Sequence, residues 1–306
     1  MLAPAMRGHL AMLGFSALVA GSFSLGALVA NDLAPTVLNA VRFAIASGVL
    51  LVLVALGPGF RRAHLRAPWR YLLLGGVFSI YFALMFEGLK TAPPVSAGAI
   101  FTLTPLMTAG FAWMLLRQGL TPRMGVALAI GAAGALWVIF RADLAALLAF
   151  DPGRGEAIYF AGCIAHALFT PLLRKLHRGE PALVVTTHVS LACCLVLGLA
   201  GLRPLLQTDW SALPALVWWT ILYTAIFASA ATFFLLQYAA QVLPASKVMA
   251  YTYLTPSWII LWELALGHGL PTALVLPGIA LSILALGLLL KDETPPPAPA
   301  QTPLPK

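Results

Sequence analysis

The sequence predicts an all-α polytopic membrane protein, in which ten transmembrane helices form two inverted repeats of five helices. Three observations lead to this fold class: the composition, the spacing of apolar segments, and a passage that occurs twice. Of the 306 residues, 61% are hydrophobic and 9% are charged, whereas a soluble domain has about 45–50% apolar and about 25% charged residues. The composition therefore indicates that lipid surrounds most of this chain.

Ten apolar segments are long enough to cross a membrane, which requires about 20 mostly apolar residues. They are residues 9–30, 35–56, 69–89, 95–116, 122–140, 156–175, 182–202, 213–236, 245–267 and 273–290. The links between them are short and rich in Pro and Gly, so they leave no room for a soluble domain. The Pro-rich tail, residues 292–306, is predicted to be disordered in the cytoplasm.

Lys and Arg residues are distributed unequally between the two sides of this topology. With a cytoplasmic N-terminus, thirteen lie on the inner side: Arg7, Arg61, Arg62, Arg66, Arg70, Arg117, Arg123, Arg174, Lys175, Arg178, Lys247, Lys291 and Lys306. Four lie on the outer side, namely Lys90, Arg141, Arg154 and Arg203, and Arg42 falls within a span. This bias predicts that both termini are cytoplasmic, and we expect a multi-pass protein of a bacterial cytoplasmic (inner) membrane.

A Leu-Thr-Pro trio occurs once in each half of the chain. The passages "FTLTPLMTAG" and "YTYLTPSWII" place Pro105 and Pro256 151 positions apart, and Phe82 and Phe233 have the same offset. The repetition predicts a duplicated five-helix unit. Because five is odd, the second copy begins on the opposite side of the membrane, as in the inverted repeats of many secondary transporters.

The duplication also predicts how the chain is divided. We expect residues 1–145 to form the first five-helix repeat and residues 152–291 to form the second, inverted repeat. Chance recurrence of the trio in a chain rich in Leu, Thr and Pro is the disfavoured alternative.

Each proline of the trio interrupts a predicted helix about 15 Å from its start, at the midplane of a hydrocarbon core about 30 Å thick. Pro105 cannot donate to the carbonyl of Phe101, and Pro256 cannot donate to that of Thr252. Two interpretations follow. The broken helices outline a midplane binding site with two hinges, or the hydroxyl groups of the adjacent threonines satisfy the carbonyls and the kinks serve packing. The symmetry of the pair favours the site.

The ten spans, the duplication and the passages "LKTAPPVSAGAIFTLTP" and "AAQVLPASKVMAYTYLTP" resemble the drug/metabolite transporter superfamily, in its EamA-type branch. Within that branch the sequence is similar to YddG-type exporters of aromatic and other neutral amino acids. The resemblance implies a central cavity lined by spans one, three, four, six, eight and nine, with spans five and ten at the periphery. One departure is that Gln118 and His268 stand where many members carry glutamate.

The predicted substrate site combines residues of these spans with the two helix breaks. Its members are Ser22, Ser79, Tyr81, Phe101, Thr104, Pro105, His166, Thr170, Tyr251, Thr252, Thr255, Pro256 and Trp258. Tyr251, Thr255 and Trp258 share one helix face, and aromatic faces with a few hydroxyl groups suit an apolar or aromatic side chain. The freed carbonyls can accept from an ammonium group, and the amides of the helix breaks can donate to a carboxylate. The site is therefore expected to match a neutral zwitterion. Packing or interfacial positions are the alternative for Tyr251 and Trp258.

Two ionisable residues within spans leave their roles open. His166 is either a functional group, as ionisable residues in membranes commonly are, or a neutral histidine that is hydrogen-bonded between helices. For Arg42 we expect structural pairing or snorkelling toward an interface.

Other classes of protein lack support in the sequence. It contains no HExxH, GxSxG or GxxxxGK[ST] motif, so we expect no catalytic residues, cofactor or metal. Cys163, Cys193 and Cys194 lie in apolar segments and are expected to be buried thiols. The expected partners are an amino-acid substrate and the lipid bilayer but no nucleic acid, and a monomer is compatible with the sequence.

The predicted function is therefore a secondary transporter that exports neutral amino acids, aromatic ones included, by alternating access. The alternative is a carrier of another small metabolite, such as a nucleotide-sugar, an organic cation or a drug. A membrane scaffold or a membrane-embedded enzyme is less favoured.

The topology can be tested by labelling introduced cysteines. Arg61→Cys and Asp143→Cys are expected to react with a membrane-impermeant thiol reagent from opposite sides of the membrane, because an odd number of spans separates them. The unsubstituted chain, with its cysteines in apolar segments, is the control. Labelling of both positions from the outside would contradict the repeat assignment.

Overall fold

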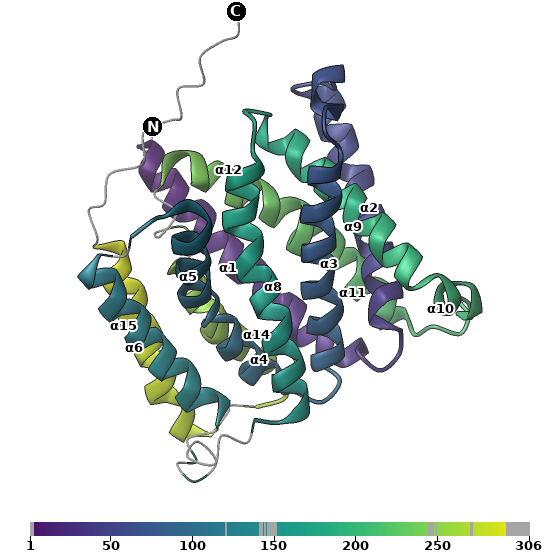
Figure 1. Ribbon diagram of the computed structural model, residues 1–306. Coiled ribbons are helices and arrows are strands. Elements are labelled where there is room, and N and C mark those ends of the chain that lie inside the picture. Colours follow the sequence, from purple (N-terminus) through teal and green to yellow (C-terminus); the bar gives the residue numbers. More distant parts are fainter. Residues whose placement is uncertain are drawn as a thin grey trace, which may run out of the picture.

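A computed structural model describes residues 3–119, 121–140, 143, 145, 152–243, 248, 250–269 and 272–291. Throughout these ranges the regular structure is helical, with no strand, and the helices lie side by side in one bundle (Figure 1). The predicted all-α class is confirmed. The predicted tail, residues 292–306, lies outside the described residues.

The first half of the chain contributes six α-helices and one short 3-10 helix. They are α1 (Pro4–Val29), α2 (Pro35–Leu56), η1 (Arg62–Leu65), α3 (Trp69–Gly88), α4 (Pro94–Phe101), α5 (Thr104–Leu116) and α6 (Pro122–Ile139).

The second half is built in a similar way, with more interruptions. Its elements are α8 (Arg154–Leu176), α9 (Ala182–Ala200), α10 (Leu202–Gln207), α11 (Ala215–Ala225), the π-helix η2 (Ile226–Ala231), α12 (Thr232–Val242), η3 (Tyr251–Leu254), α14 (Thr255–Ala265), η4 (Ala273–Val275) and α15 (Leu276–Leu290).

Nine helical segments of the described chain are long and apolar enough to cross a membrane. They agree closely with nine of the ten predicted spans. The remaining predicted span, 245–267, is represented by η3 and α14, and residues 244–247 lie outside the described residues. The count of ten therefore remains a prediction.

Proline determines where many of these helices begin. A proline occupies the first or second helical position of α1, α2, α4, α5, α6, α14 and α15. The first N–H groups of a helix have no partner within it, so a residue without an N–H leaves nothing unsatisfied there. Pro105 and Pro256 act in the same way, but inside a span: each begins a new helix after a tight turn or a 3-10 segment.

Both predicted helix breaks are present. Between α4 and α5, Thr102 and Leu103 form a turn, and η3 leads directly into α14. The hydroxyl of Thr102 donates to the carbonyl of Ala99 at 2.6 Å, which helps to close the last turn of α4. In α8, by contrast, Pro171 lies inside a continuous helix.

The helices pack in a way that leaves one pair at the edge of the bundle. α3 packs against both α8 and α9, α2 packs along α9, and α1 packs against α12 and α14. α6 and α15 lie along each other at the side of the bundle (Figure 1), which agrees with the peripheral place that the resemblance implies for spans five and ten.

An ion pair fixes the start of α3 to the link between α8 and α9. Arg70 Nη2 lies 2.7 Å from Glu180 Oε1, and the side chains are only 3% and 7% exposed. Burial alone would raise the pKa of Glu180, but hydrogen bonds from Arg70 and from the N–H of Arg178 lower that pKa to about 2. The carboxylate is therefore ionised at neutral pH.

Two glycines bring the backbones of α6 and α15 into contact. A Cβ atom placed at Gly278 would lie 2.7 Å from the carbonyl oxygen of Gly134, and one at Gly134 would lie 2.5 Å from that of Gly278. Small residues allow close approach of membrane helices, whose association depends on packing. Gly287, on the same helix as Gly278, has no atom within 4 Å of the corresponding position.

Gly278→Ala is expected to destabilise the protein by about 1–3 kcal/mol, because the new methyl group forces α6 and α15 apart. Thermal unfolding of the purified protein in detergent micelles measures the loss. Gly287→Ala is the matched control, since it gains the same helix propensity of about 1 kcal/mol without a clash. Equal stability of the two variants would show that the Gly134–Gly278 contact does not hold the pair together.

Candidate functional site

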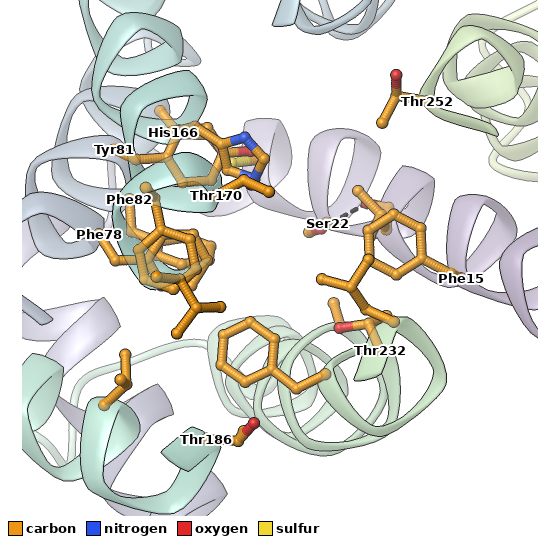
Figure 2. Close-up of a pocket in the computed structure, with 18 of the residues that line it drawn as sticks. Phe15, Ser22, Phe78, Tyr81, Phe82, His166, Thr170, Thr186, Thr232 and Thr252 are labelled. Carbon is orange, nitrogen blue, oxygen red and sulfur yellow. Dashed lines mark hydrogen bonds between the residues drawn. The ribbon is translucent and has the colours of Figure 1, made fainter. Parts of the chain in front are cut away.

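A cavity lies at the centre of the bundle, enclosed by α1, α2, α3, α8, α9, η2 and α12 and by the two helix breaks (Figure 2). Its volume is about 70 Å³, whereas small-molecule sites commonly have about 300–1,000 Å³. An occupant of the size of an amino acid therefore requires the surrounding side chains to move apart.

The lining of the cavity repeats with the offset of the Leu-Thr-Pro trios. Residues 151 positions apart line it in pairs: Phe15 with His166, Val19 with Thr170, Ser22 with Leu173, Tyr81 with Thr232, Phe82 with Phe233, Met85 with Leu236, and Phe101 with Thr252. Both halves of the chain thus contribute matching positions to one space. The duplication seen in the sequence coincides with the construction of the cavity.

Aromatic rings form one wall. Phe78 stacks on Phe169 with ring centroids 4.3 Å apart and on Phe233 with ring centroids 5.4 Å apart. It meets Phe82 edge to face, with ring centroids 4.8 Å apart. These rings come from α3, α8 and α12, so the wall spans both halves of the chain. Such a surface suits an apolar or aromatic group of a ligand.

His166 lies among aromatic rings at the edge of this wall (Figure 2). Its ring centroid is 4.6 Å from that of Tyr81, 5.2 Å from Phe101 and 5.7 Å from Phe78. The buried Nδ1 atom has no hydrogen-bond partner among the described residues. Of the two interpretations of His166, the geometry favours a group that is available to an occupant of the cavity.

Hydroxyl groups and the two helix breaks form much of the remaining surface. Figure 2 shows Ser22, Thr232 and Thr252 around the space, with Thr252 and Phe15 across it from Phe78 and Phe82. Pro105 and Pro256 have no N–H to donate to the carbonyl groups of Phe101 and Thr252, and the carbonyl of Thr252 accepts instead from the N–H of Thr255. Phe101 and Thr252 line the same cavity.

The structure divides the predicted site residues into two groups. Ser22, Tyr81, Phe101, His166, Thr170 and Thr252 line the cavity, whereas Ser79, Thr104, Pro105, Tyr251, Thr255, Pro256 and Trp258 do not. Both prolines and both trio threonines are buried within the helix breaks. Their place is directly behind the lining, where they set the course of the backbone.

Tyr251 and Trp258 contact α1 rather than the cavity. The hydroxyl of Tyr251 lies 2.9 Å from Nδ1 of His9, and Nε1 of Trp258 donates to Oγ of Ser16 at 3.0 Å. Tyr251 lies in the 3-10 segment η3 and Trp258 in α14, and both side chains pack on the same neighbouring helix. Periodicity identified the face and could not identify its partner.

Several lining residues were not among those predicted. Arg42 on α2 and Thr186 on α9 line the cavity, although the resemblance implies no contribution from spans two and seven. Phe78 and Phe169 were missed because eight of the ten predicted spans contain aromatic residues, so an aromatic side chain alone does not indicate the cavity. The 151-residue offset could have found Phe15, Thr232 and Phe233 once Tyr81, Phe82 and His166 had been considered.

The described residues contain no group of three or more His, Cys, Asp or Glu side chains that could hold a metal ion. Cys163 and Cys193 are buried and Cys194 is partly buried, and all three are free thiols. The chemistry that the cavity offers is therefore contact with aromatic faces, a few hydroxyl groups, one imidazole and one guanidinium group.

Known proteins with similar sequences are transporters. The chain is 27% identical over 262 residues to YyaM, an uncharacterized transporter of Bacillus subtilis (strain 168), a match that covers 85% of this chain and 86% of YyaM. It is 30% identical over 131 residues to YddG, an aromatic amino acid exporter of Ancylobacter novellus, with 42% of this chain and 45% of YddG covered.

The fold also has a counterpart among solved structures. A crystal structure matches with a TM-score of 0.66 at 20% identity, over 93% of this chain and 95% of the other. The model of the EamA-like transporter family matches residues 6–140 and, a second time, residues 153–291. Because these two matches cover nearly the whole sequence, the chain belongs to the EamA-like transporter family.

Proposed function

We propose that the protein is a secondary carrier that exports neutral amino acids, aromatic ones included, across a bacterial cytoplasmic membrane by alternating access. The observation that carries this proposal is the central cavity, which is lined by matching residues of both halves and by both helix breaks. A carrier requires a site that two parts of the protein can enclose from either side.

The side chains of the cavity support the substrate class. The rings of Phe78, Phe169 and Phe233 match an apolar or aromatic side chain, and hydroxyl groups such as those of Ser22 and Thr252 match polar groups of an amino acid. The likeness to YddG, an aromatic amino acid exporter, supports the same class.

The direction of transport and the orientation of the chain in the membrane are part of the same proposal. Both termini are cytoplasmic, as the distribution of Lys and Arg residues predicts. In this orientation the Arg70–Glu180 ion pair lies at the cytoplasmic side of the bundle. The carrier alternates as the half-helices on either side of Pro105 and Pro256 pivot separately.

The substrate class can be tested by competition in proteoliposomes that contain only this protein. Uptake of labelled phenylalanine is expected to saturate and to be inhibited by unlabelled phenylalanine, tryptophan and threonine. Nucleotide-sugars and organic cations are expected to have no effect, and protein-free liposomes provide the background. Inhibition by nucleotide-sugars together with indifference to amino acids would overturn the substrate assignment and leave the fold unaffected.

The helix breaks can be tested by replacing both prolines. Pro105→Ala, Pro256→Ala and the double variant are expected to fold, because alanine restores the missing backbone hydrogen bond. An interior proline disfavours a straight helix by about 3 kcal/mol, so its loss can shift a hinge equilibrium about 100-fold toward the straight form. Flux is therefore expected to fall, most strongly in the double variant.

Flux and ligand binding should both be measured for these variants. Pro277→Ala is the matched control, since this proline lies in the exposed first turn of α15, away from the cavity. Wild-type flux in the double variant would show that the kinks serve packing and that the carrier does not pivot there.

A further inference from the structure

Arg42 places a permanent positive charge in the interior of the bundle. It belongs to α2, its side chain is 1% exposed, and it lines the central cavity. A buried arginine inside a membrane is costly, and such residues commonly mark the pathway of a substrate or an ion. The corresponding place in α9, counted from the start of each helix, is that of His188 and Val189, neither of which is an arginine or a lysine.

The groups that hold Arg42 are all neutral. Nε donates to Oγ of Ser229 at 2.8 Å, Nη2 donates to the carbonyl of Ala228 at 3.0 Å, and Nη1 lies 3.5 Å from Oδ1 of Asn39. The guanidinium carbon lies 4.2 Å from the ring centroid of Phe82. These dipoles and the ring stabilise the cation without neutralising it.

No carboxylate compensates the charge within the part of the chain that the structure describes. The ion pairs found there are Arg70–Glu180, Lys90–Glu87 and His268–Glu263, and none involves Arg42. Arg42 differs in this respect from Arg70, which is equally buried but has Glu180 as its partner. A buried cation without a counter-anion is energetically costly, and an anionic ligand lowers this cost by supplying the missing negative charge.

The guanidinium group also retains hydrogen-bonding capacity. It has five N–H donors, and the contacts of Arg42 use three of them, the one to Asn39 being long. The remaining hydrogens are on Nη1 and Nη2, the two nitrogens that form parallel hydrogen bonds with a carboxylate. The chemistry of the cavity therefore contains one site suited to a planar anion.

We propose that Arg42 binds the carboxylate of the transported solute, so that the protein selects compounds that carry an anionic group beside an apolar or aromatic body. This proposal rests on the proposed carrier function and narrows its substrate class. The carboxylate lies near Phe82, and Thr252 is across the cavity from that ring (Figure 2). An amino acid bound in this way directs its ammonium group toward that opposite side.

The position of Arg42 also links ligand binding to the two halves of the chain. The side chain extends from α2 in the first half to Ala228 and Ser229 in the π-helix η2 of the second half. Single π-helical turns occur frequently at functional sites. An anion on Arg42 therefore acts on a contact that joins the halves.

A purely structural role for Arg42 predicts a different pattern of ligand preference. If Arg42 only holds α2 against η2, its replacement weakens the binding of every ligand to a similar degree. If it binds the carboxylate, its replacement weakens only ligands that have one. The ratio of affinities for an acid and its amide separates the two roles.

The experiment measures dissociation constants of four related probes by calorimetry on the purified full chain: L-phenylalanine, 3-phenylpropionate, L-phenylalaninamide and phenethylamine. The wild type is expected to bind the two carboxylates more tightly than the two amines. Arg42→Gln is expected to lose about tenfold or more for both carboxylates, as the removal of a charge-assisted hydrogen bond entails, with the amines unaffected. Arg42→Lys is expected to retain part of the preference.

Ser47→Ala is the matched structural control. Ser47 lies on the same helix as Arg42, is buried, and joins α2 to α9 through Oγ of Ser190 at 2.9 Å, away from the cavity. This variant is expected to keep the acid-to-amide ratio of the wild type. A parallel loss of all four ligands in Arg42→Gln, or an unchanged ratio, would overturn the proposal.

The wild-type protein alone provides a test that does not depend on the folding of any variant. Tighter binding of the amines than of the carboxylates by the wild type would overturn the proposal. Arg42-dependent binding of 3-phenylpropionate without transport of amino acids would refute amino-acid export and support the role of Arg42. If amino acids are transported but the preference for acids does not depend on Arg42, amino-acid export would be supported and the proposed role of Arg42 would be refuted.

Discussion

A peptide group in the hydrocarbon core has no water to bond with, so each helix end and each break in this chain needs a partner within the protein. The prolines show how this constraint is met. At the starts of α1, α2, α4 and α6 they occupy positions whose N–H groups would have no partner in the helix. At Pro105 and Pro256 the same residue type interrupts a span, and the affected carbonyls belong to residues that line the cavity. The two interruptions therefore lie beside the cavity.

The helices themselves were largely predictable from the sequence, because apolar length and proline position are both local properties. The predicted segments 35–56 and 122–140 agree with α2 and α6 to within a residue at each end. The π-helix η2 was not predictable in this way. The carbonyl of Ala228 in η2 accepts a hydrogen bond from Arg42, which is 186 positions away in the sequence. Local sequence patterns do not contain a contact of this kind.

The residues of the candidate site were predicted in part, and the errors in that prediction have a common cause. Phe101, His166 and Thr252 line the cavity as expected, because the broken helices and the repeat locate them. Tyr251 and Trp258 do not, because helical spacing groups residues on a face without naming the neighbour of that face. For Arg42 we expected structural pairing or snorkelling near a cavity wall or a helix end, and its side chain lines the cavity. The remaining contributions come from packing between distant segments, which no local pattern contains.

The difference between the uninterrupted helix α3 and the span that contains the π-helix η2 has a consequence for the resting state of the proposed alternating carrier. Two identical halves would give an inward-facing and an outward-facing form of equal free energy, since exchange of the halves converts one form into the other. Here the first half supplies Arg42 and the uninterrupted helix α3, whereas the second half supplies a span that contains the π-helix η2. The two forms of the proposed carrier are then no longer equivalent, so their free energies in the empty protein are expected to differ before any solute gradient acts on it.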